Sequence, residues 1–231
     1  MFKAGTTNEQ DRVKWIEQTL KKIPQGLTIL DAGAGELQFK KFCSHLNYIS
    51  QDFGQYTGEG NVGLQTGTWD NAKLDIVSDI TSIPLPDASV DAIMCTEVFE
   101  HIPDPIAAIK EFSRLIKPGG YLLTTAPFAS LTHFAPYHFA SGLSRFFYEK
   151  HFPDHGFEIQ ELTFNGNYFE YIAQENHRIK SVARKYAKRK LNVLEKIFIH
   201  LTIYILGRLS KRDTNSSELL CYGIHVFARK K

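Results

Sequence analysis

The chain has 231 residues, of which 43% are hydrophobic and 23% charged, and its formal net charge is +2. This length suits one α/β domain with a single core, and the composition excludes a disordered or fibrous chain. The net charge gives no reason by itself to expect nucleic acid, and three scattered cysteines fit a reduced, cytoplasmic protein better than a disulfide framework.

The predicted elements begin near the N-terminus. Glu9 and Asp11 follow Met1 closely, so we expect no signal peptide there. Apolar residues at helical spacing then predict a helix over 8–23, which ends at a Pro-Gln-Gly turn. Strands and helices alternate after it: strands at 27–31, 47–51, 74–79, 90–95 and 120–126, and helices at 36–46 and 104–117. This alternation predicts a mostly parallel sheet with helices on both faces.

A glycine turn follows the first predicted strand. Gly33 and Gly35 let the backbone approach a ligand closely, because glycine has no Cβ and tolerates positive φ. Asp52 ends the next strand, at the distance where an acid binds ribose hydroxyls. A dinucleotide fingerprint would need glycine where Gln38 stands, and Asp31 would repel phosphates but suits an ammonium group. The pattern favours S-adenosylmethionine, which carries an ammonium group, a ribose and no phosphate.

The segment between Asp52 and Leu74 departs from the alternation. It contains Tyr56, Trp69 and five glycines: Gly54, Gly58, Gly60, Gly63 and Gly67. Five glycines in so short a span predict an irregular loop rather than a helix. Its place beside the ribose acid makes it a candidate cover for adenosine, and the alternative is a surface loop whose Trp69 only packs on the domain.

Three further segments, at 74–80, 89–101 and 112–123, have sequences that occur in this order and at this spacing in a known family. Together with the glycine turn, they make residues 27–127 similar to class I S-adenosylmethionine-dependent methyltransferases of the type 11-like group. The resemblance implies a Rossmann-like, doubly wound α/β fold with seven mostly parallel strands, an antiparallel last strand and a helical insertion before it. The chain also resembles methyltransferases of bacterial cell-surface polysaccharide clusters.

The resemblance implies that S-adenosylmethionine is held by residues at the carboxyl ends of the strands: Asp31, Gly33, Gly35, Asp52, Asp79, Ile80 and Thr96. Asp52 would bind the ribose hydroxyls, while Asp79 and the backbone of Ile80 would contact adenine. The others would lie near the methionine part. The alternative for Asp79 is a cap at the end of its strand.

The methyl acceptor is expected over the same edge of the sheet, where ligands of open α/β sheets bind. Methyl transfer depends on alignment, and a hydroxyl acceptor also needs a base. The loop at 128–139 supplies His133 and His138, and histidine titrates near neutrality. We expect one of them to be the base and prefer His138, with the acceptor between this loop and a helix beginning near Ser141.

Glu97, Glu100 and His101 form a Glu-x-x-Glu-His run. With a downstream histidine, this run resembles the magnesium site of plant small-RNA 2′-O-methyltransferases and of some ubiquinone-pathway O-methyltransferases. The same run is widespread in related methyltransferases with no known metal. We therefore expect no metal.

The whole chain, 1–231, is expected to be one methyltransferase domain with a helical insertion at 164–218. The insertion joins a strand near 157–163 to the last strand at 222–229. Residues 178–212 hold eleven Lys and Arg and one acid, and the apolar stretch 191–209 predicts a helix with a narrow polar stripe. Its charged groups argue against a membrane span. It is therefore either a buried or dimer-forming helix or a helix lying on an anionic membrane.

The favoured function is O-methylation of a small molecule, a sugar or a sugar-like metabolite, without nucleic acid as a partner. One alternative is a metal-assisted RNA 2′-O-methyltransferase that uses the basic region 178–212 to hold phosphates. A noncatalytic S-adenosylmethionine-binding protein is the third possibility.

Overall fold

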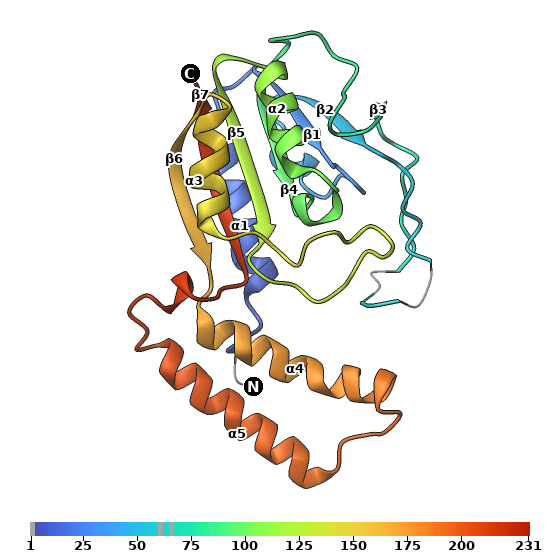
Figure 1. Ribbon diagram of the computed structural model, residues 1–231, viewed down its shortest axis with the longest axis vertical. Coiled ribbons are helices and arrows are strands. Elements are labelled where there is room, and N and C mark those ends of the chain that lie inside the picture. Colours follow the sequence, from blue (N-terminus) through green and yellow to red (C-terminus); the bar gives the residue numbers. More distant parts are fainter. Residues whose placement is uncertain (1–2, 60–61, 65–66) are drawn as a thin grey trace. The chain divides into compact units, whose positions relative to one another are not determined.

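The computed structural model describes residues 3–59, 62–64 and 67–231, so Gly60 of the glycine-rich loop lies outside the described residues. Within these ranges one sheet has the strand order β3-β2-β1-β4-β5-β7-β6 (Figure 1). Its strands are β1 (Thr28–Ala32), β2 (Asn47–Asp52), β3 (Ile76–Val77), β4 (Val90–Thr96), β5 (Ile116–Pro127), β6 (Phe157–Asn165) and β7 (Gly223–Lys230). Strands β1 to β5 run parallel, whereas β7 is antiparallel to β5. The predicted fold class is confirmed.

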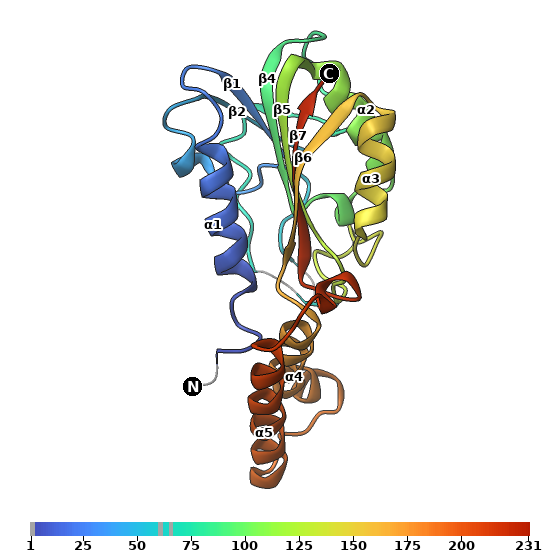
Figure 2. The same cartoon turned by 90° about the vertical axis from the view of Figure 1, so that its left-hand side faces the viewer.

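Helices cover both faces of this sheet. From Lys14 onward, α1 (Asn8–Leu20) lies on one face, and α2 (Pro105–Leu115) and α3 (Arg145–Asp154) lie on the other (Figure 2). Leu30, Ile93 and Leu122, on three neighbouring strands, are fully buried. Burial on both faces explains why the central strands are continuous apolar runs in the sequence.

The start of α2 follows its local sequence. The Asp104 side chain accepts hydrogen bonds from the backbone N–H groups of Ile106 and Ala107, and Pro105 occupies the first turn. The helix ends at Leu115 and β5 begins at the next residue, so the Pro-Gly-Gly segment after Lys117 lies within the strand. A register shift between β4 and β5 accommodates it.

The predicted helix over 36–46 is wrong. Residues 36–46 form successive turns and a short 3₁₀ helix, Lys40–Phe42, closed by bonds such as Lys40 N–H to Leu37 O. Leu37 has a φ of 61°, which an α-helix cannot accommodate. Phe39, Cys43 and Leu46 are nevertheless buried. Their spacing of four and three residues fits a run of turns as well as a helix, and the sequence does not distinguish the two.

Residues 1–13 and 164–222 form one compact unit, and residues 14–163 and 223–231 form the other. The first unit contains α4 (Tyr168–Tyr186), α5 (Val193–Ser210) and a 3₁₀ turn, Ser216–Glu218. α5 begins with a capping box, in which Asn192 and Glu195 bond each other's backbone N–H groups. The helix predicted at 191–209 is thus present. Among the described residues, no helix is long and apolar enough to cross a membrane.

Candidate active site

The glycine turn lies directly after β1. Gly33 has a φ of +80°, and its N–H donates to Gln51 O at 2.8 Å. A Cβ on Gly33 would lie 2.4 Å from Val98 Cγ2, and one on Gly35 would lie 2.7 Å from Trp69 Cζ2. A side chain larger than hydrogen therefore does not fit at either position while Val98 and Trp69 pack against the turn.

Asp31 occupies the end of β1 and is almost completely buried. One carboxylate oxygen, Oδ2, accepts a 2.5 Å hydrogen bond from the Tyr48 hydroxyl. The other, Oδ1, is buried and has no hydrogen-bond partner among the described residues. Burial raises the pKa of Asp31 to about 7, and the nearby Asp52 adds to the increase against the opposing effect of Tyr48. A buried acceptor of this kind suits a cationic group such as the ammonium of S-adenosylmethionine.

Asp52, at the end of β2, connects the glycine turn to the loop that follows β2. Its Oδ2 accepts from Gly35 N–H at 3.0 Å, and its Oδ1 accepts from Gly54 N–H at 2.9 Å. Each carboxylate oxygen has a second lone pair, so ribose hydroxyls can still donate to it. The two hydrogen bonds fix the orientation of the carboxylate, and its position is consistent with the expected ribose contact.

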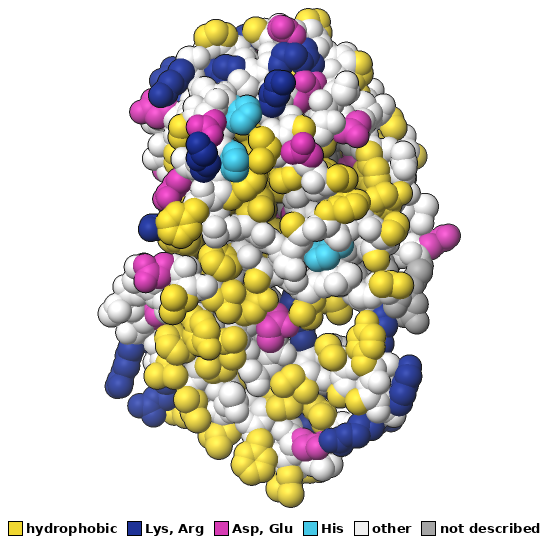
Figure 3. Space-filling model, viewed as in Figure 1, with side chains coloured by type: hydrophobic (Ala, Val, Ile, Leu, Met, Phe, Trp, Pro, Cys, Tyr) yellow, Lys and Arg dark blue, Asp and Glu magenta, His cyan; other side chains and the backbone are white. Residues whose placement is uncertain are grey.

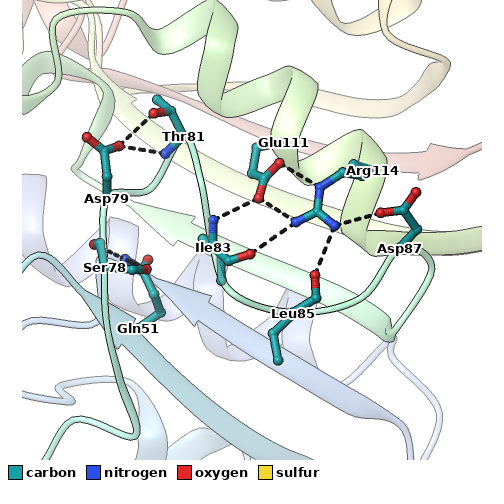
Figure 4. A network of polar contacts seen from close by, with 9 residues as sticks. All are labelled: Gln51, Ser78, Asp79, Thr81, Ile83, Leu85, Asp87, Glu111 and Arg114. Carbon is teal, nitrogen blue, oxygen red and sulfur yellow. Dashed lines mark hydrogen bonds and ion pairs between the residues drawn. The ribbon is translucent and has the colours of Figure 1, made fainter.

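Asp79 follows β3 and is exposed, and its Oδ1 accepts two 2.7 Å hydrogen bonds from Thr81 (Figure 4). This is the strand-end cap that the sequence offered as an alternative. The adenine contact of Asp79 and of the buried Ile80 stays a prediction.

The segment after Asp79 is held by a network that the sequence analysis missed. The Arg114 guanidinium donates to Ile83 O and Leu85 O and pairs with Glu111 and Asp87 (Figure 4). Glu111 in turn accepts from Ile83 N–H at 2.8 Å. These bonds fix the backbone on the edge of the site where adenine is expected, because bidentate Arg–carboxylate pairs have a defined geometry. Arg114 lies in the segment that carries the resemblance, but nothing local indicated its partners.

Thr96 is buried at the carboxyl end of β4. The next residue, Glu97, has a φ of 55°, and its N–H donates to Thr125 O at 2.8 Å. The Thr125 hydroxyl donates to Glu97 Oε1 at 2.9 Å. The Glu97 carboxylate is therefore bonded to β5.

Three histidines gather beside this edge. His101, His133 and His138 each offer a ring nitrogen, and these nitrogens lie within 4.8 Å of one another. His101 Nδ1 bonds Tyr137 O at 2.6 Å and His133 Nδ1 bonds Leu131 O at 2.9 Å. Since a carbonyl only accepts, both Nδ1 atoms carry the hydrogen, which leaves both Nε2 atoms as acceptors in the neutral rings.

The electrostatics keep at least two of these rings neutral. Burial lowers the pKa of His101 to about 3, with the neighbouring His133 contributing. Burial and His133 also lower the pKa of His138. The buried Glu100 carboxylate lies 3.5 Å from His101 Nε2 and 3.9 Å from His133 Nε2. In its ionised form, the Glu100 carboxylate would stabilise a positive charge on either imidazole.

The cluster is compatible with two chemistries. Both ring nitrogens of His138 are buried and lack hydrogen-bond partners among the described residues, so one nitrogen of the neutral ring has an unused lone pair that can accept a proton. The three nitrogens also have the spacing of ligands that a divalent ion could bridge. The sequence-based expectation of no metal stays a prediction. The resemblance linked His101 with a downstream histidine, and the structure shows that both His133 and His138 lie beside it.

The glycine-rich loop packs against the loop that carries His133. Leu64 N–H donates to Thr132 O at 2.8 Å, and Tyr56 stacks on Phe134 with ring centroids 3.5 Å apart. Trp69 lies edge-on to both rings. No helix forms between Asp52 and Leu74 in the described residues, as predicted. The helix expected near Ser141 begins at Arg145 instead, after an extended Ser144.

Comparison with known proteins finds a similarity that covers part of the chain. Residues 30–124 match a family described as a methyltransferase domain. Ubiquinone biosynthesis O-methyltransferase from Leptothrix cholodnii is 30% identical over 117 residues, which cover 48% of this chain and 48% of that protein. The chain therefore spans about half the length of this curated relative.

Solved structures share the fold. Geranyl diphosphate C-methyltransferase from Streptomyces coelicolor, in complex with Mg²⁺, geranyl-S-thiolodiphosphate and S-adenosyl-L-homocysteine, has a TM-score of 0.56 at 13% identity. The match covers 96% of this chain and 76% of that protein. The [4+2]-cyclase SpnF has a TM-score of 0.57 at 16% identity, with 96% and 81% covered. The matched domain at residues 30–124 confirms the methyltransferase resemblance seen in the sequence, and the solved structures confirm the fold that it implies. Identities this low show the fold alone, and a fold does not fix a reaction.

Proposed function

We propose that this protein binds S-adenosylmethionine and transfers its methyl group to an oxygen of a small molecule. The observation that carries the proposal is Asp31 Oδ1, a buried carboxylate oxygen without a hydrogen-bond partner among the described residues, beside a turn that admits only glycine. An ammonium group there removes the cost of a buried charge, whereas a phosphate would be repelled. The matched methyltransferase domain supports the same assignment.

The cofactor would be held by the seven residues named from the sequence. Asp31 would bind the ammonium, with Gly33 and Gly35 allowing close backbone approach, and Asp52 would accept from the ribose hydroxyls. Asp79, Ile80 and Thr96 would complete the site at adenine and at the methionine end. Bound S-adenosylmethionine supplies the methyl group, which passes to the acceptor oxygen as the carbon–sulfur bond breaks.

The acceptor hydroxyl would lose its proton to the histidine cluster. His138 is the proposed base because its neutral ring has two buried nitrogens without partners in the described part of the chain. His133 is the second candidate, since the Glu100 carboxylate 3.9 Å away would stabilise the imidazolium. The expected gain from such a base is roughly 10²–10⁴-fold in rate.

A hydroxylated small molecule is the proposed acceptor, and a sugar or sugar-like metabolite is the finer choice. The relative named ubiquinone biosynthesis O-methyltransferase supports oxygen as the acceptor atom. The sequence resemblance to methyltransferases of polysaccharide clusters favours a sugar. An RNA 2′-hydroxyl is the alternative acceptor, supported by the basic residues of 178–212 and by the resemblance of the run at 97–101 to the magnesium site of RNA 2′-O-methyltransferases.

Two assays test the proposal together. Calorimetry should detect binding of S-adenosylhomocysteine and none of NAD; NAD binding without S-adenosylhomocysteine binding would overturn the cofactor. Radiolabelled S-adenosylmethionine should then transfer label to a member of a panel of sugar nucleotides and free sugars. Label that appears in RNA instead would favour the nucleic-acid alternative, and cofactor binding with no transfer to sugars, catechols or RNA would favour a noncatalytic protein.

A further inference from the structure

The outer side of α5 exposes a row of large apolar residues. The outer face comprises seven side chains that are 43–70% exposed: Val193, Leu194, Ile197, Phe198, Leu201, Ile205 and Leu209. Only Ile203 and Leu206 of this helix are buried. Figure 3 shows hydrophobic side chains gathered over α5, with Lys and Arg toward both ends.

We propose that this outer face docks into the surface of a membrane rich in anionic lipids. The face is a continuous row of large apolar side chains that are each 43–70% exposed, and contiguous exposed patches of apolar residues mark interaction sites. Such a patch on a well-formed helix indicates a partner. The proposal does not depend on methyl transfer.

The dimensions and side chains of α5 favour a helix lying in the plane of the membrane surface. Its 18 residues span about 27 Å. No helix in the described part of the chain is long and apolar enough to cross a bilayer. Lys196 and His200 are exposed within it, and a helix lying in the interface can direct such groups toward water.

Charge complementarity selects lipid over a second copy of the chain. Residues 178–212 contain eleven Lys and Arg and a single acid, Glu195. That acid is occupied by an ion pair with Arg189 and by the N-terminal capping box of α5. Two such faces brought together would repel each other, whereas anionic headgroups attract Lys and Arg that flank an apolar surface.

Aromatic residues add a second feature of interfacial helices. Tyr186, the last residue of α4, is 60% exposed, and Tyr204 within α5 is 40% exposed. The Arg208 guanidinium lies 5.9 Å from the centre of the Tyr204 ring. Tyrosine suits the headgroup region, because its ring is apolar and its hydroxyl is polar.

Vesicle flotation of the full chain tests the proposal. Phosphatidylcholine vesicles are compared with vesicles that also contain phosphatidylglycerol, at low and high salt. We expect the protein to bind the anionic vesicles about tenfold more strongly and to lose this preference at high salt, because salt screens charges within about a Debye length. The variant Phe198→Ser/Leu201→Ser should bind about tenfold less, since it removes buried apolar contact.

Two control variants separate the contribution of the apolar outer face from that of the basic residues. Leu219→Ser changes a residue that is 70% exposed outside α5, so binding should stay at the wild-type level. Lys188→Glu/Lys190→Glu should abolish the preference for anionic vesicles while leaving weak binding to neutral ones. Circular dichroism establishes that each variant keeps its helices.

Two results would overturn the membrane assignment. If the wild type and Phe198→Ser/Leu201→Ser floated equally with the vesicles, the outer face would not be the membrane-binding surface. Absence of vesicle binding, together with a concentration-dependent dimer that the same variant dissociates, would assign the face to a second copy. Neither result bears on cofactor binding, which calorimetry measures separately.

Discussion

Asp31 is expected to lower the stability of the protein at neutral and alkaline pH, because it holds a charge in a buried site. Its pKa is 3.8 in an ordinary environment and about 7 in the folded protein. At a pH between these two pKa values, the native state binds more protons than the unfolded state. The free energy of unfolding therefore falls as the pH rises from about 4 to about 7. At pH 8 the charged carboxylate costs about 4 kcal/mol relative to a neutral one.

The substitution Asp31→Asn removes this titration. Between pH 5 and pH 8, proton linkage at Asp31 lowers the free energy of unfolding of the wild type by about 2–3 kcal/mol. The variant should not show this decrease. The buried amide introduces donors that lack partners, which costs about 1–3 kcal/mol at every pH. The difference in pH dependence, rather than stability at a single pH, therefore carries the prediction.

Urea unfolding of the ligand-free protein at several pH values between 5 and 8 measures this difference. Asp154→Asn, the same substitution at an exposed position, is the matched control for the change of Asp to Asn itself. S-adenosylhomocysteine should stabilise the wild type more than Asp31→Asn, because the variant lacks the charge that binds the ammonium. Parallel profiles for wild type and Asp31→Asn would refute the reasoning about the buried charge.

Three further predictions concern the site. Asp52→Ala should weaken S-adenosylhomocysteine binding by about 1–3 kcal/mol in calorimetry, because charge-assisted hydrogen bonds are lost, and an unchanged affinity would remove Asp52 from the ribose contact. His138→Ala should lower turnover at least about tenfold at unchanged S-adenosylhomocysteine affinity; if it and His133→Ala both retain wild-type turnover, neither is the base. Excess EDTA should leave turnover near its untreated level, whereas complete loss that magnesium or manganese restores would promote the metal-assisted alternative.

The sequence by itself determined the features that depend on neighbouring residues. The order of strands along the chain and the cap at Asp104 follow from patterns a few residues long. The capping box of Asn192 and Glu195 is equally local, but the sequence analysis assigned both residues to a polar stripe. The glycine turn and the acids Asp31 and Asp52 were also identifiable, because chemistry at the end of a strand needs particular residue types at fixed spacing. Apolar spacing alone was ambiguous at 36–46, where turns bury the same residues as a helix would.

Only the tertiary structure decided which distant residues meet. His101 follows β4, while His133 and His138 follow β5, and the parallel pairing of these strands brings all three to one edge. The contact of Trp69 with the Gly35 turn and the bonds of Arg114 to the segment after Asp79 likewise join separate parts of the chain. The raised pKa of Asp31 also depends on the tertiary structure, because burial is its main cause. Such contacts depend on how the whole chain closes on itself, and no local pattern encodes them.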